Sequence, residues 1–314
     1  MNDDIISVVI PAYNSAETLE KCVKSITDSE YRFLQIIIVE NGSTDNTLEI
    51  ATKLKNADDR IEVYSSDKGV SKARNFALKK IKGKYVTFVD SDDYVYSKYF
   101  LTLYNDLVDN NADLSVVGLK TEPEDDENNL QVIDNLKAMQ FFIEGSLDGY
   151  VWGKLFKSEL LENLKFDEKL LICEDRKFLL DYLVKIRKIT INDAKLYFYF
   201  QREDSVTNET FSVKWYDLVL ESAYDLHMIE KYYPQLKKTA TDKVVKDNIR
   251  FAISCIFNGI EIENKKKNIV KTVQKYKKSI FSKNIIFKHK VYMFAMFFGW
   301  DAFAFVFKIT KRSK

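Results

Sequence analysis

Histidine, cysteine and glycine are scarce in this chain, and each shortage argues against a class of functional site. There are 2 histidines, 3 cysteines and 9 glycines among 314 residues. Two histidines are a poor supply for a histidine-rich zinc site or for a Ser-His-Asp triad. Cys22, Cys173 and Cys255 are odd in number and far apart in the sequence. They therefore predict no disulfide framework, and they favour a reducing compartment.

Two glycine-rich phosphate motifs are also missing. No GxGxxG follows the first predicted strand, which argues against a Rossmann oxidoreductase, and no GxxxxGK[ST] indicates a P-loop phosphotransferase. The first residues, MNDD, lack the basic start and the long apolar stretch of a secretory signal, so we expect a cytoplasmic protein. Hydrophobic residues make up 46% of the chain, which is enough for a sizeable core and excludes disorder throughout.

The net charge of +1 conceals an uneven distribution of charge. Residues 265–314 hold 14 Lys and Arg with a single acid, Asp301, whereas the other 264 residues hold 34 Lys and Arg and 46 acids. Such a split predicts an acidic body and a basic tail that meets an anionic surface.

Short apolar runs alternate with segments of helical spacing over roughly the first 120 residues. We predict strands at 5–10, 34–39, 61–64, 85–89 and 114–117, and helices at 15–27, 43–54, 71–80 and 98–110. This alternation predicts a mainly parallel sheet with helices on both faces. Ligands of such sheets bind beyond the carboxyl ends of the strands, so the residues after each strand are the candidates for function.

The pattern changes in the second part of the chain. An acidic stretch at 122–129 predicts a loop, and helices follow residue 135 with one aromatic strand at 196–200. From residue 213 onward every segment has helical character. We therefore predict an α/β catalytic domain at 1–212, with a nucleotide-binding half at 1–118 and an acceptor-side half at 119–212. A helical C-terminal region at 213–314 completes the predicted organisation.

The first two strand ends carry residues suited to a nucleotide. Pro11, Ala12, Tyr13 and Asn14 follow the first strand, where small Ala12 admits a ligand to the backbone and Tyr13 offers a flat face for a base. An ordinary strand end and turn explains these residues equally well. Glu40 follows the second strand, and its carboxylate can accept the imide N–H of uracil, which cytosine lacks. A turn with a helix cap is the alternative there.

Charged residues follow the next two strands. Arg74 lies near the start of a predicted helix, which suits an anionic ligand, although a surface salt bridge is the commoner role. Asp90, Asp92 and Asp93 place three carboxylates within four residues, directly after a buried strand. Their mutual repulsion requires compensation by a cation or by hydrogen-bond donors. One or two carboxylates together with substrate phosphates are the usual ligands of Mg²⁺ or Mn²⁺ in proteins. The position after an apolar strand disfavours the alternative, a solvated acidic turn.

Four of these segments together resemble the family 2 glycosyltransferases, which have the GT-A fold. The segments are VVIPAYN at 8–14, IVENGSTD at 38–45, GVSKARN at 69–75 and FVDSDD at 88–93. Each is moderately specific, and the four in this order at strand ends are highly specific. The resemblance covers roughly the first 210 residues. VWGKLFK at 151–157, CEDRKF at 173–178 and YFQREDSV at 199–206 are similar to segments of the capsule and teichoic-acid members.

The resemblance implies a role for each matching residue. Glu40 would bind the uracil where the family usually has Asp, and Asp67 lies near a position where Asn is common. Asp90 would contact the ribose or the metal, and Asp92 would be the metal ligand. The remaining roles implied are general base for Asp175 beside Glu174, diphosphate binding for Arg202 and Ser205, nucleotide binding for Pro11, Ala12, Tyr13, Asn14 and Arg74, and the donor-sugar or acceptor side for Trp152, Lys154 and Asp93. Without the resemblance, Glu174 and Asp175 would be interpreted as an acidic pair that complements a helix dipole.

The activity that the resemblance implies is an inverting transfer of a hexose or N-acetylhexosamine that depends on Mn²⁺ or Mg²⁺. The donor would be a nucleotide-diphosphate sugar, UDP-linked, and the acceptor a hydroxyl of a cell-surface glycan, a lipid-linked or polymer acceptor, or a glycoprotein. A single base suffices because the metal assists the leaving diphosphate. A catalytically inactive sugar-nucleotide binding module and a metal-dependent nucleotidyltransferase remain open. The sugar, the linkage and the acceptor are left unassigned, as is the presence of a homo-oligomer.

An aromatic segment at 291–307 follows the lysine-rich stretch. Gly299 interrupts it and Asp301 is costly in a lipid core, whereas a spanning helix needs roughly 20 largely apolar residues. We therefore predict an interfacial segment that holds the protein peripherally on the inner face of the cell membrane, with lysines on anionic lipid. A helical pair packed on the catalytic domain or on a second subunit is the alternative. No recognised nucleic-acid module accompanies the charge, so we expect no nucleic-acid partner.

Overall fold

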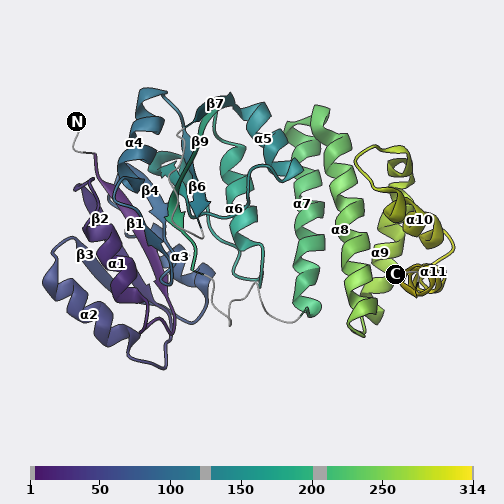
Figure 1. The fold of residues 1–314 in the computed structure, drawn as a ribbon, viewed down its shortest axis with the longest axis horizontal. Helices are drawn as coiled ribbons and strands as arrows, with labels where there is room; N and C mark the ends of the chain where they lie inside the picture. Colours follow the sequence, from purple (N-terminus) through teal and green to yellow (C-terminus); the bar gives the residue numbers. More distant parts are fainter. Residues whose placement is uncertain (1–3, 121–128, 201–210, 313–314) are drawn as a thin grey trace. The chain divides into compact units, whose positions relative to one another are not determined.

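The computed structural model describes residues 4–120, 129–200 and 211–312 (Figure 1). The chain forms two compact units. The sheet unit comprises Met1–Met139, Asp148–Lys169 and Glu174–Ser205, and the helical unit comprises Gln140–Leu147, Leu170–Cys173 and Val206–Lys314. The domain boundary near residue 212 stays a prediction.

A single mixed sheet forms the sheet unit. Its strand order is β3-β2-β1-β4-β8-β6-β9-β5, with β7 paired to β9. The described strands are β1 (Ile6–Ala12), β2 (Leu34–Glu40), β3 (Ile61–Ser65), β4 (Tyr85–Phe88), β5 (Tyr94–Val95), β6 (Leu114–Lys120), β7 (Leu130–Asp134), β8 (Lys154–Lys157) and β9 (Lys188–Phe198). The predicted α/β class with a mainly parallel sheet and a helical C-terminal region is confirmed.

The first half of the sheet is parallel throughout. β1 pairs in parallel with β2 and β4, and β2 pairs in parallel with β3. Right-handed crossovers place the helices α1 (Leu19–Thr27) and α2 (Thr47–Ala57) on one face, and α3 (Val70–Leu78), which returns the chain toward β4, on the other. Because every residue of β1 and β2 is buried, these strands have the continuous apolar sequence that predicts them.

β1 extends through Pro11, where the sequence predicts its end. Proline has no N–H to donate, so it is tolerated only where a neighbouring strand is absent. The pairing of β1 with β4 ends at Val9, which lies opposite Phe88, whereas the pairing with β2 continues to Ala12 opposite Glu40. Pro11 therefore sits beyond the end of β4, where the ladder needs no donor.

Two predicted helices begin later than their sequence patterns indicate. The carbonyl of Ser15 accepts hydrogen bonds from the N–H groups of Thr18 and Leu19, so the chain makes a turn before α1. Asp45 accepts a hydrogen bond of 3.0 Å from the N–H of Thr47, and α2 starts there. These polar residues hold turns rather than extending the helices.

The second half of the sheet differs from the prediction of a single strand at 196–200. The structure has β7, β8 and the eleven-residue β9, which pairs in parallel with β6 and antiparallel with β5 and β7. Asn192 and Asp193 interrupt the apolar pattern of β9 beside an irregularity of the ladder at Val117 and Gly118. β8 is only four residues long and has a lysine at each end. Tertiary pairing, not strand propensity, forms these strands.

The other helices of the described residues follow the predicted order. The sheet unit contributes α4 (Tyr99–Asp109) and α6 (Glu174–Leu183). The helix α5 (Asn135–Glu144) begins in a segment of the sheet unit and ends in a segment of the helical unit. The helical unit has α7 (Asp217–Tyr232), α8 (Lys237–Phe257), α9 (Glu263–Lys275), α10 (Phe287–Met296) and α11 (Trp300–Arg312), together with the 3₁₀ turns η2 (Val213–Tyr216), η3 (Pro234–Leu236) and η4 (Lys277–Phe281). The 3₁₀ turn η1 (Ser158–Leu161) is in the sheet unit. The acidic stretch at 122–129, predicted as a loop, lies almost entirely outside the described residues.

The helical unit has an apolar core of its own. Ile249 and Ile269 are fully buried, and so are Tyr292, Met296 and Phe303 of the aromatic segment at 291–307, here called the aromatic tail. Part of the segment predicted to lie in a membrane interface is thus the interior of this unit. Over the described ranges, no helix combines the length and the apolar character that crossing a bilayer requires.

Candidate active site

The loops after β1 and β2 are tied together by Asn14. Its backbone is left-handed, with φ 46°, a conformation that Asn tolerates better than most residues. The N–H of Asn14 donates to Oγ of Ser43 at 3.0 Å, and its Oδ1 accepts from the N–H of Thr44 at 2.9 Å. Asn14, predicted to contact the nucleotide, therefore also fixes the two loops that would hold a base.

The loop after β4 is joined to the same assembly. The hydroxyls of Ser15 and Ser91 share a hydrogen bond of 2.7 Å, and Oγ1 of Thr18 donates to the carbonyl of Ser91 at 2.9 Å. No motif in the sequence singles out these hydroxyl residues. Their only signal in the sequence is their position next to the motifs.

Arg74 brings together residues that are far apart in the sequence. Its side chain is 3% exposed, and its guanidinium bonds Oδ1 of Asp90 at 3.0 Å and Oε1 of Glu174 at 3.3 Å. It also bonds Oδ1 of Asp175. Asp90 lies 16 residues from Arg74, and Glu174 lies 100 residues away. One buried cation thus joins the end of β4 to the first turn of α6.

This cluster holds more negative than positive charge. Burial raises the pKa of Asp175, the charges of Glu174 and Asp90 raise it further, and Arg74 opposes them, with a resulting pKa of about 7. The N–H of Val151 also donates to the carboxylate. A carboxyl group with a pKa near 7 can accept and release a proton at neutral pH, which is the property of a general base or acid.

The three aspartates after β4 have different surroundings. Asp93 is 1% exposed, and its carboxylate accepts from the hydroxyl of Tyr197 at 2.6 Å and from the N–H of Phe200 at 2.8 Å. Burial raises the pKa of Asp93 to about 8, with Asp90 contributing. Its carboxylate is engaged inside the loop, and its role on the donor-sugar or acceptor side stays a prediction. Asp90 and Asp92 are half-buried.

Removing the hydroxyl of Tyr197 should loosen this loop. The hydroxyl also accepts a hydrogen bond of 3.1 Å from the N–H of Asp90, so a Tyr197→Phe protein leaves two buried polar groups without that partner. We expect a loss of about 1–3 kcal/mol in the free energy of unfolding, measured by urea denaturation. Tyr64→Phe is the matched control, because Tyr64 bonds Glu62 in a more exposed setting on β3. Equal losses in both variants would contradict a special role for Tyr197.

The donors after β4 are chemically suited to a divalent cation. Mg²⁺ and Mn²⁺ prefer hard oxygen ligands, which the carboxylates of Asp90 and Asp92 supply. Burial raises the pKa of the Cys22 thiol beneath this loop, and the charges of Asp93, Asp92 and Asp90 raise it further. The loop therefore carries concentrated negative charge that a cation would offset. Within the described residues, no three His, Cys, Asp or Glu side chains are placed to hold a metal by themselves.

The predicted base-binding residues lie at the ends of β1 and β2. Pro11 and Ala12 are buried in β1, and Tyr13 is 36% exposed. Nζ of Lys68 lies 2.6 Å from the hydroxyl of Tyr13 and 4.4 Å from the centre of its ring. Glu40 is buried, and its Oε1 accepts a hydrogen bond from the N–H of Ser43. That contact is the turn-capping role which the sequence left open beside uracil binding.

Aromatic rings stack beside the aspartates. Trp152 packs face to face with Tyr150, with ring centres 4.5 Å apart, and with Tyr197, with ring centres 5.0 Å apart. Lys154 is 1% exposed, and its Nζ bonds Asp148 at 2.5 Å. Trp152 thus lies next to the tyrosine that supports Asp93, whereas the ammonium of Lys154 is held inside the protein. Arg202 and Ser205, predicted to bind a diphosphate, lie outside the described residues.

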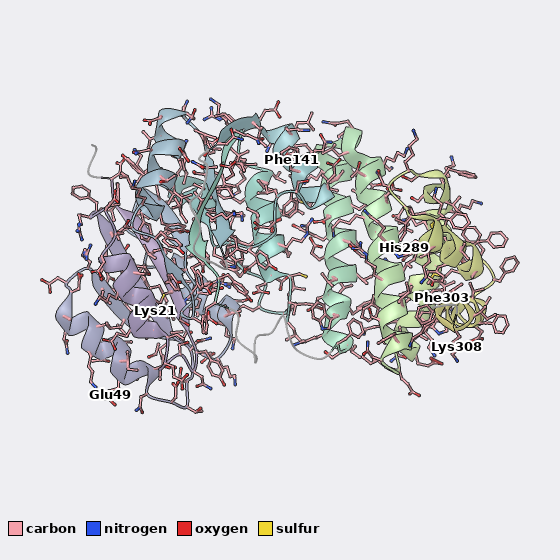
Figure 2. All side chains as sticks on the ribbon, viewed as in Figure 1. Lys21, Glu49, Phe141, His289, Phe303 and Lys308 are labelled. Carbon is pink, nitrogen blue, oxygen red and sulfur yellow. The ribbon has the colours of Figure 1, made fainter. Side chains whose placement is uncertain are left out.

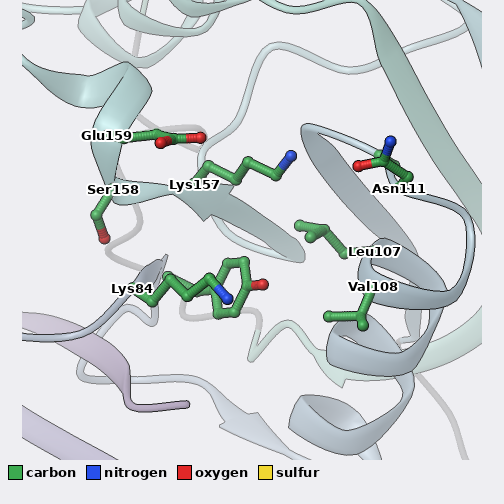
Figure 3. Close-up of a pocket in the computed structure, with 9 residues that line it drawn as sticks. Lys84, Leu107, Val108, Asn111, Lys157, Ser158 and Glu159 are labelled. Atoms are coloured by element: carbon green, nitrogen blue, oxygen red, sulfur yellow. The ribbon is translucent and has the colours of Figure 1, made fainter. Parts of the chain in front are cut away.

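A pocket of about 390 Å³ lies elsewhere in the sheet unit (Figure 3). It is lined by Lys84, Tyr85, Leu107, Val108, Asn111, Ala112, Lys157, Ser158 and Glu159. Lys84 and Tyr85 are at the amino end of β4, whereas the aspartates follow its carboxyl end. This pocket therefore lies away from the carboxyl ends of the strands, where ligands of such sheets bind.

Comparisons with known proteins identify relatives. Residues 7–169 match the family described as Glycosyl transferase family 2. Glycosyltransferase GlyA of Streptococcus pneumoniae is 32% identical over 70% of this chain and 34% of its own length. The poly(ribitol-phosphate) beta-glucosyltransferase of Bacillus spizizenii is 29% identical over 63% of this chain and 32% of its own. The chain thus spans about a third of the length of each of these two proteins.

Solved structures share the fold. The crystal structure of residues 1–349 of S. aureus TarS in complex with UDP-GlcNAc has a TM-score of 0.75 to this chain. The likeness covers 98% of this chain and 92% of that one, at 18% sequence identity. At that identity the likeness concerns the fold, and it extends over the elements of both units.

Proposed function

Because the chain belongs to glycosyl transferase family 2, we propose that it is an inverting transferase dependent on Mn²⁺ or Mg²⁺. It moves a hexose or N-acetylhexosamine from a UDP-linked donor to a hydroxyl of a glycan, polymer or lipid-linked acceptor. The observation that carries this proposal is the contact of Arg74 with Asp90, Glu174 and Asp175 at the carboxyl end of β4. It gathers an acidic loop and a candidate base at the edge of the sheet where substrates bind.

The nucleotide end of the donor lies over the loops after β1 and β2 in this proposal. Tyr13 offers its exposed face to the base, and Glu40 accepts the imide N–H of uracil while one oxygen stays on Ser43. Asn14 holds the two loops at a fixed separation. Such fixed positioning lowers the entropic cost of reaching the reactive geometry.

Asp175 is the general base. It takes the proton from the acceptor hydroxyl as that oxygen attacks the anomeric carbon, and the bond to the diphosphate breaks with its electrons left on the phosphate oxygen. Asp92 and Asp90 would hold the divalent cation, which stabilises the leaving diphosphate when bound. Arg74 keeps Asp175 oriented, and its charge favours the ionised form of that carboxyl.

The donor and acceptor classes come from the relatives. The structure of TarS contains UDP-GlcNAc, and the Bacillus spizizenii relative is named for poly(ribitol-phosphate) as its acceptor. We infer a UDP-sugar and a polymeric or lipid-linked acceptor for this chain as well. The basic charge and the aromatic residues of the C-terminal segment support a location for this reaction in the cytoplasm, peripherally on the inner face of the cell membrane.

Binding of UDP and Mn²⁺ is the direct test of the donor site. At concentrations about 100 times the dissociation constant, the pair should raise the melting temperature of the wild-type protein by about 5 °C. An Asp92→Asn protein should lose the part of the shift that depends on Mn²⁺. Asp109→Asn, an exposed position on α4, is the matched control and should keep the full shift.

The reaction product separates the competing activities. Incubation with a UDP-sugar and a glycan acceptor should release free UDP, whereas a nucleotidyltransferase would release pyrophosphate. A full thermal shift without release of UDP under any donor and acceptor combination would support an inactive binding module instead. The absence of any shift with UDP and Mn²⁺ would count against the donor assignment.

A further inference from the structure

Large apolar side chains are exposed together in the helical unit. Phe281, Phe287 and Phe298 are 86%, 81% and 73% exposed, and Phe294 is 57% exposed. Single exposed apolar residues are normal on soluble proteins. Four phenylalanines that are more than half exposed within eighteen positions are not, and such groups mark surfaces that meet another apolar phase. We call these four residues the phenylalanine surface.

The geometry of α10 accounts for this surface. Phe287, Phe294 and Phe298 are spaced by seven and four residues, which places them on one side of a helix and its continuation. The rings of Phe294 and Phe298 have centres 5.5 Å apart. The opposite side of α10 carries Tyr292 and Met296, which are fully buried in the core of the unit. α10 therefore already has its packing partner, and the phenylalanines face away from it.

Neighbouring elements have the same two-sided character. η4, which ends at Phe281, packs against α10. On α11, Phe303 is fully buried against Tyr292, whereas Phe305 and Lys308 are exposed (Figure 2 labels Phe303 and Lys308). The aromatic tail thus divides its side chains between the interior of the unit and its surface.

The charge beside Phe281 and Phe287 has one sign. Residues 275–290 contain six lysines and no acid. Lys277, Lys278, Lys283 and Lys288 are exposed, and they lie in or beside the segments that carry Phe281 and Phe287. An apolar surface bordered by ammonium groups is complementary to a lipid interface of negative charge, where rings enter between the head groups and lysines contact the phosphates.

We infer that the phenylalanine surface and these four lysines dock the protein on an anionic lipid bilayer. The inference specifies the peripheral location proposed above and rests on that part of the proposed function only, not on the transfer reaction. A second copy of the chain is a poorer occupant. In a two-fold symmetric dimer the same surface meets itself, so lysines would face lysines across the interface. Repulsion between these like charges opposes the association of two copies.

Vesicle binding by the full chain tests this inference. The wild-type protein should sediment with vesicles that contain phosphatidylglycerol and bind much more weakly to vesicles of phosphatidylcholine alone. Replacing Phe287, Phe294 and Phe298 together by serine should weaken binding to the anionic vesicles about a hundredfold. The matched control replaces Phe33, Leu48 and Leu136, three exposed apolar residues of the sheet unit, by serine and should bind like the wild type.

The lysines provide a second, independent variant. Replacing Lys277, Lys278, Lys283 and Lys288 by glutamine should weaken binding to anionic vesicles at least about tenfold, and added salt should weaken wild-type binding in the same way. Equal affinity of the wild-type and phenylalanine variants for anionic vesicles would overturn the inference. So would a wild-type protein that dimerises without vesicles and becomes monomeric only in the phenylalanine variant.

The transfer proposal and this inference fail separately. A protein that shows the thermal shift with UDP and Mn²⁺ but does not bind anionic vesicles contradicts only the docking surface. One that binds the vesicles but shows no shift contradicts only the donor site. The phenylalanine and lysine variants should keep the full shift, which also shows that they remain folded.

Discussion

An Asp175→Asn protein should lose about two to four orders of magnitude in kcat while its KM for the donor changes little. Asparagine keeps the shape of the side chain but cannot accept the proton of the acceptor hydroxyl, and removing a general base typically costs a factor of about 100–10,000. Donor binding depends on loops after β1, β2 and β4. Asp175 reaches the last of these only through Arg74, whose bonds to Asp90 and Glu174 remain in the variant. The measurement is the release of UDP at saturating donor and acceptor.

Asp181→Asn is the matched control for this variant. Asp181 lies on the same helix, α6, and pairs with Lys177 at 3.0 Å, away from Arg74. We expect its kcat to stay within about twofold of the wild type, because its contact is a local ion pair of the i,i+4 kind. Similar losses in the two variants would indicate that damage to α6, rather than loss of a base, reduces the rate.

The pH dependence gives a second readout of Asp175. With a pKa of about 7, the carboxyl is increasingly ionised as the pH rises from 6 to 8, so kcat should rise through this range and then level off. The residual activity of Asp175→Asn should lack this rise.

The effect of pH on stability has the opposite direction. Because the pKa of the folded protein is above the unfolded value of 3.8, the folded state binds more protons between pH 4 and 7, and Asp175 lowers stability as the pH rises through that window.

Much of the fold could be predicted because buried parallel strands leave a clear pattern. β1 and β2 are buried along their whole length, so apolar residues predominate there, and the polar exceptions Ser7 and Gln35 bond each other. β8 and β9 could not be predicted in the same way. Lys154 is buried in β8 because Asp148 pairs with it, and no local pattern reveals such a partner. β9 contains Asn192, whose amide is held by Asp106 on α4 at 2.7 Å.

The candidate site shows the same division between local and distant information. The motifs identified Arg74, Asp90 and Asp175 one at a time, and each had an ordinary alternative role. The contacts that bring them together span about 100 residues, and a local sequence pattern does not encode contacts over such a separation. Tyr197 was not identified at all, because an aromatic residue in an apolar strand is expected to pack. Its hydroxyl serves Asp90 and Asp93 only through the pairing of β9 with its neighbours.

Replacing Arg74 by methionine should destabilise the protein by about 3–5 kcal/mol at pH 7.5. Methionine keeps most of the length and the apolar contacts of the side chain, but it leaves three carboxylates together without their cation. Removing one partner of a buried ion pair has a cost of this size because the remaining charges stay buried and uncompensated. The measurement is the free energy of unfolding in urea. Arg60→Met is the matched control, because Arg60 pairs with Asp58 where both side chains are about a quarter exposed, and its loss should be much smaller.

The loss in Arg74→Met should shrink as the pH is lowered to 5.5. Without the guanidinium, the pKa of Asp175 rises further, so this carboxyl takes up a proton that the unfolded chain binds only at lower pH. Protonation of Asp175 removes its repulsion with Asp90 and Glu174, and the folded state regains part of the lost stability. A cavity or lost packing would instead give a loss independent of pH. A pH-independent difference between Arg74→Met and the wild type would therefore contradict the view that Arg74 acts as the counter-ion that allows the acidic loop and the candidate base to share one edge of the sheet.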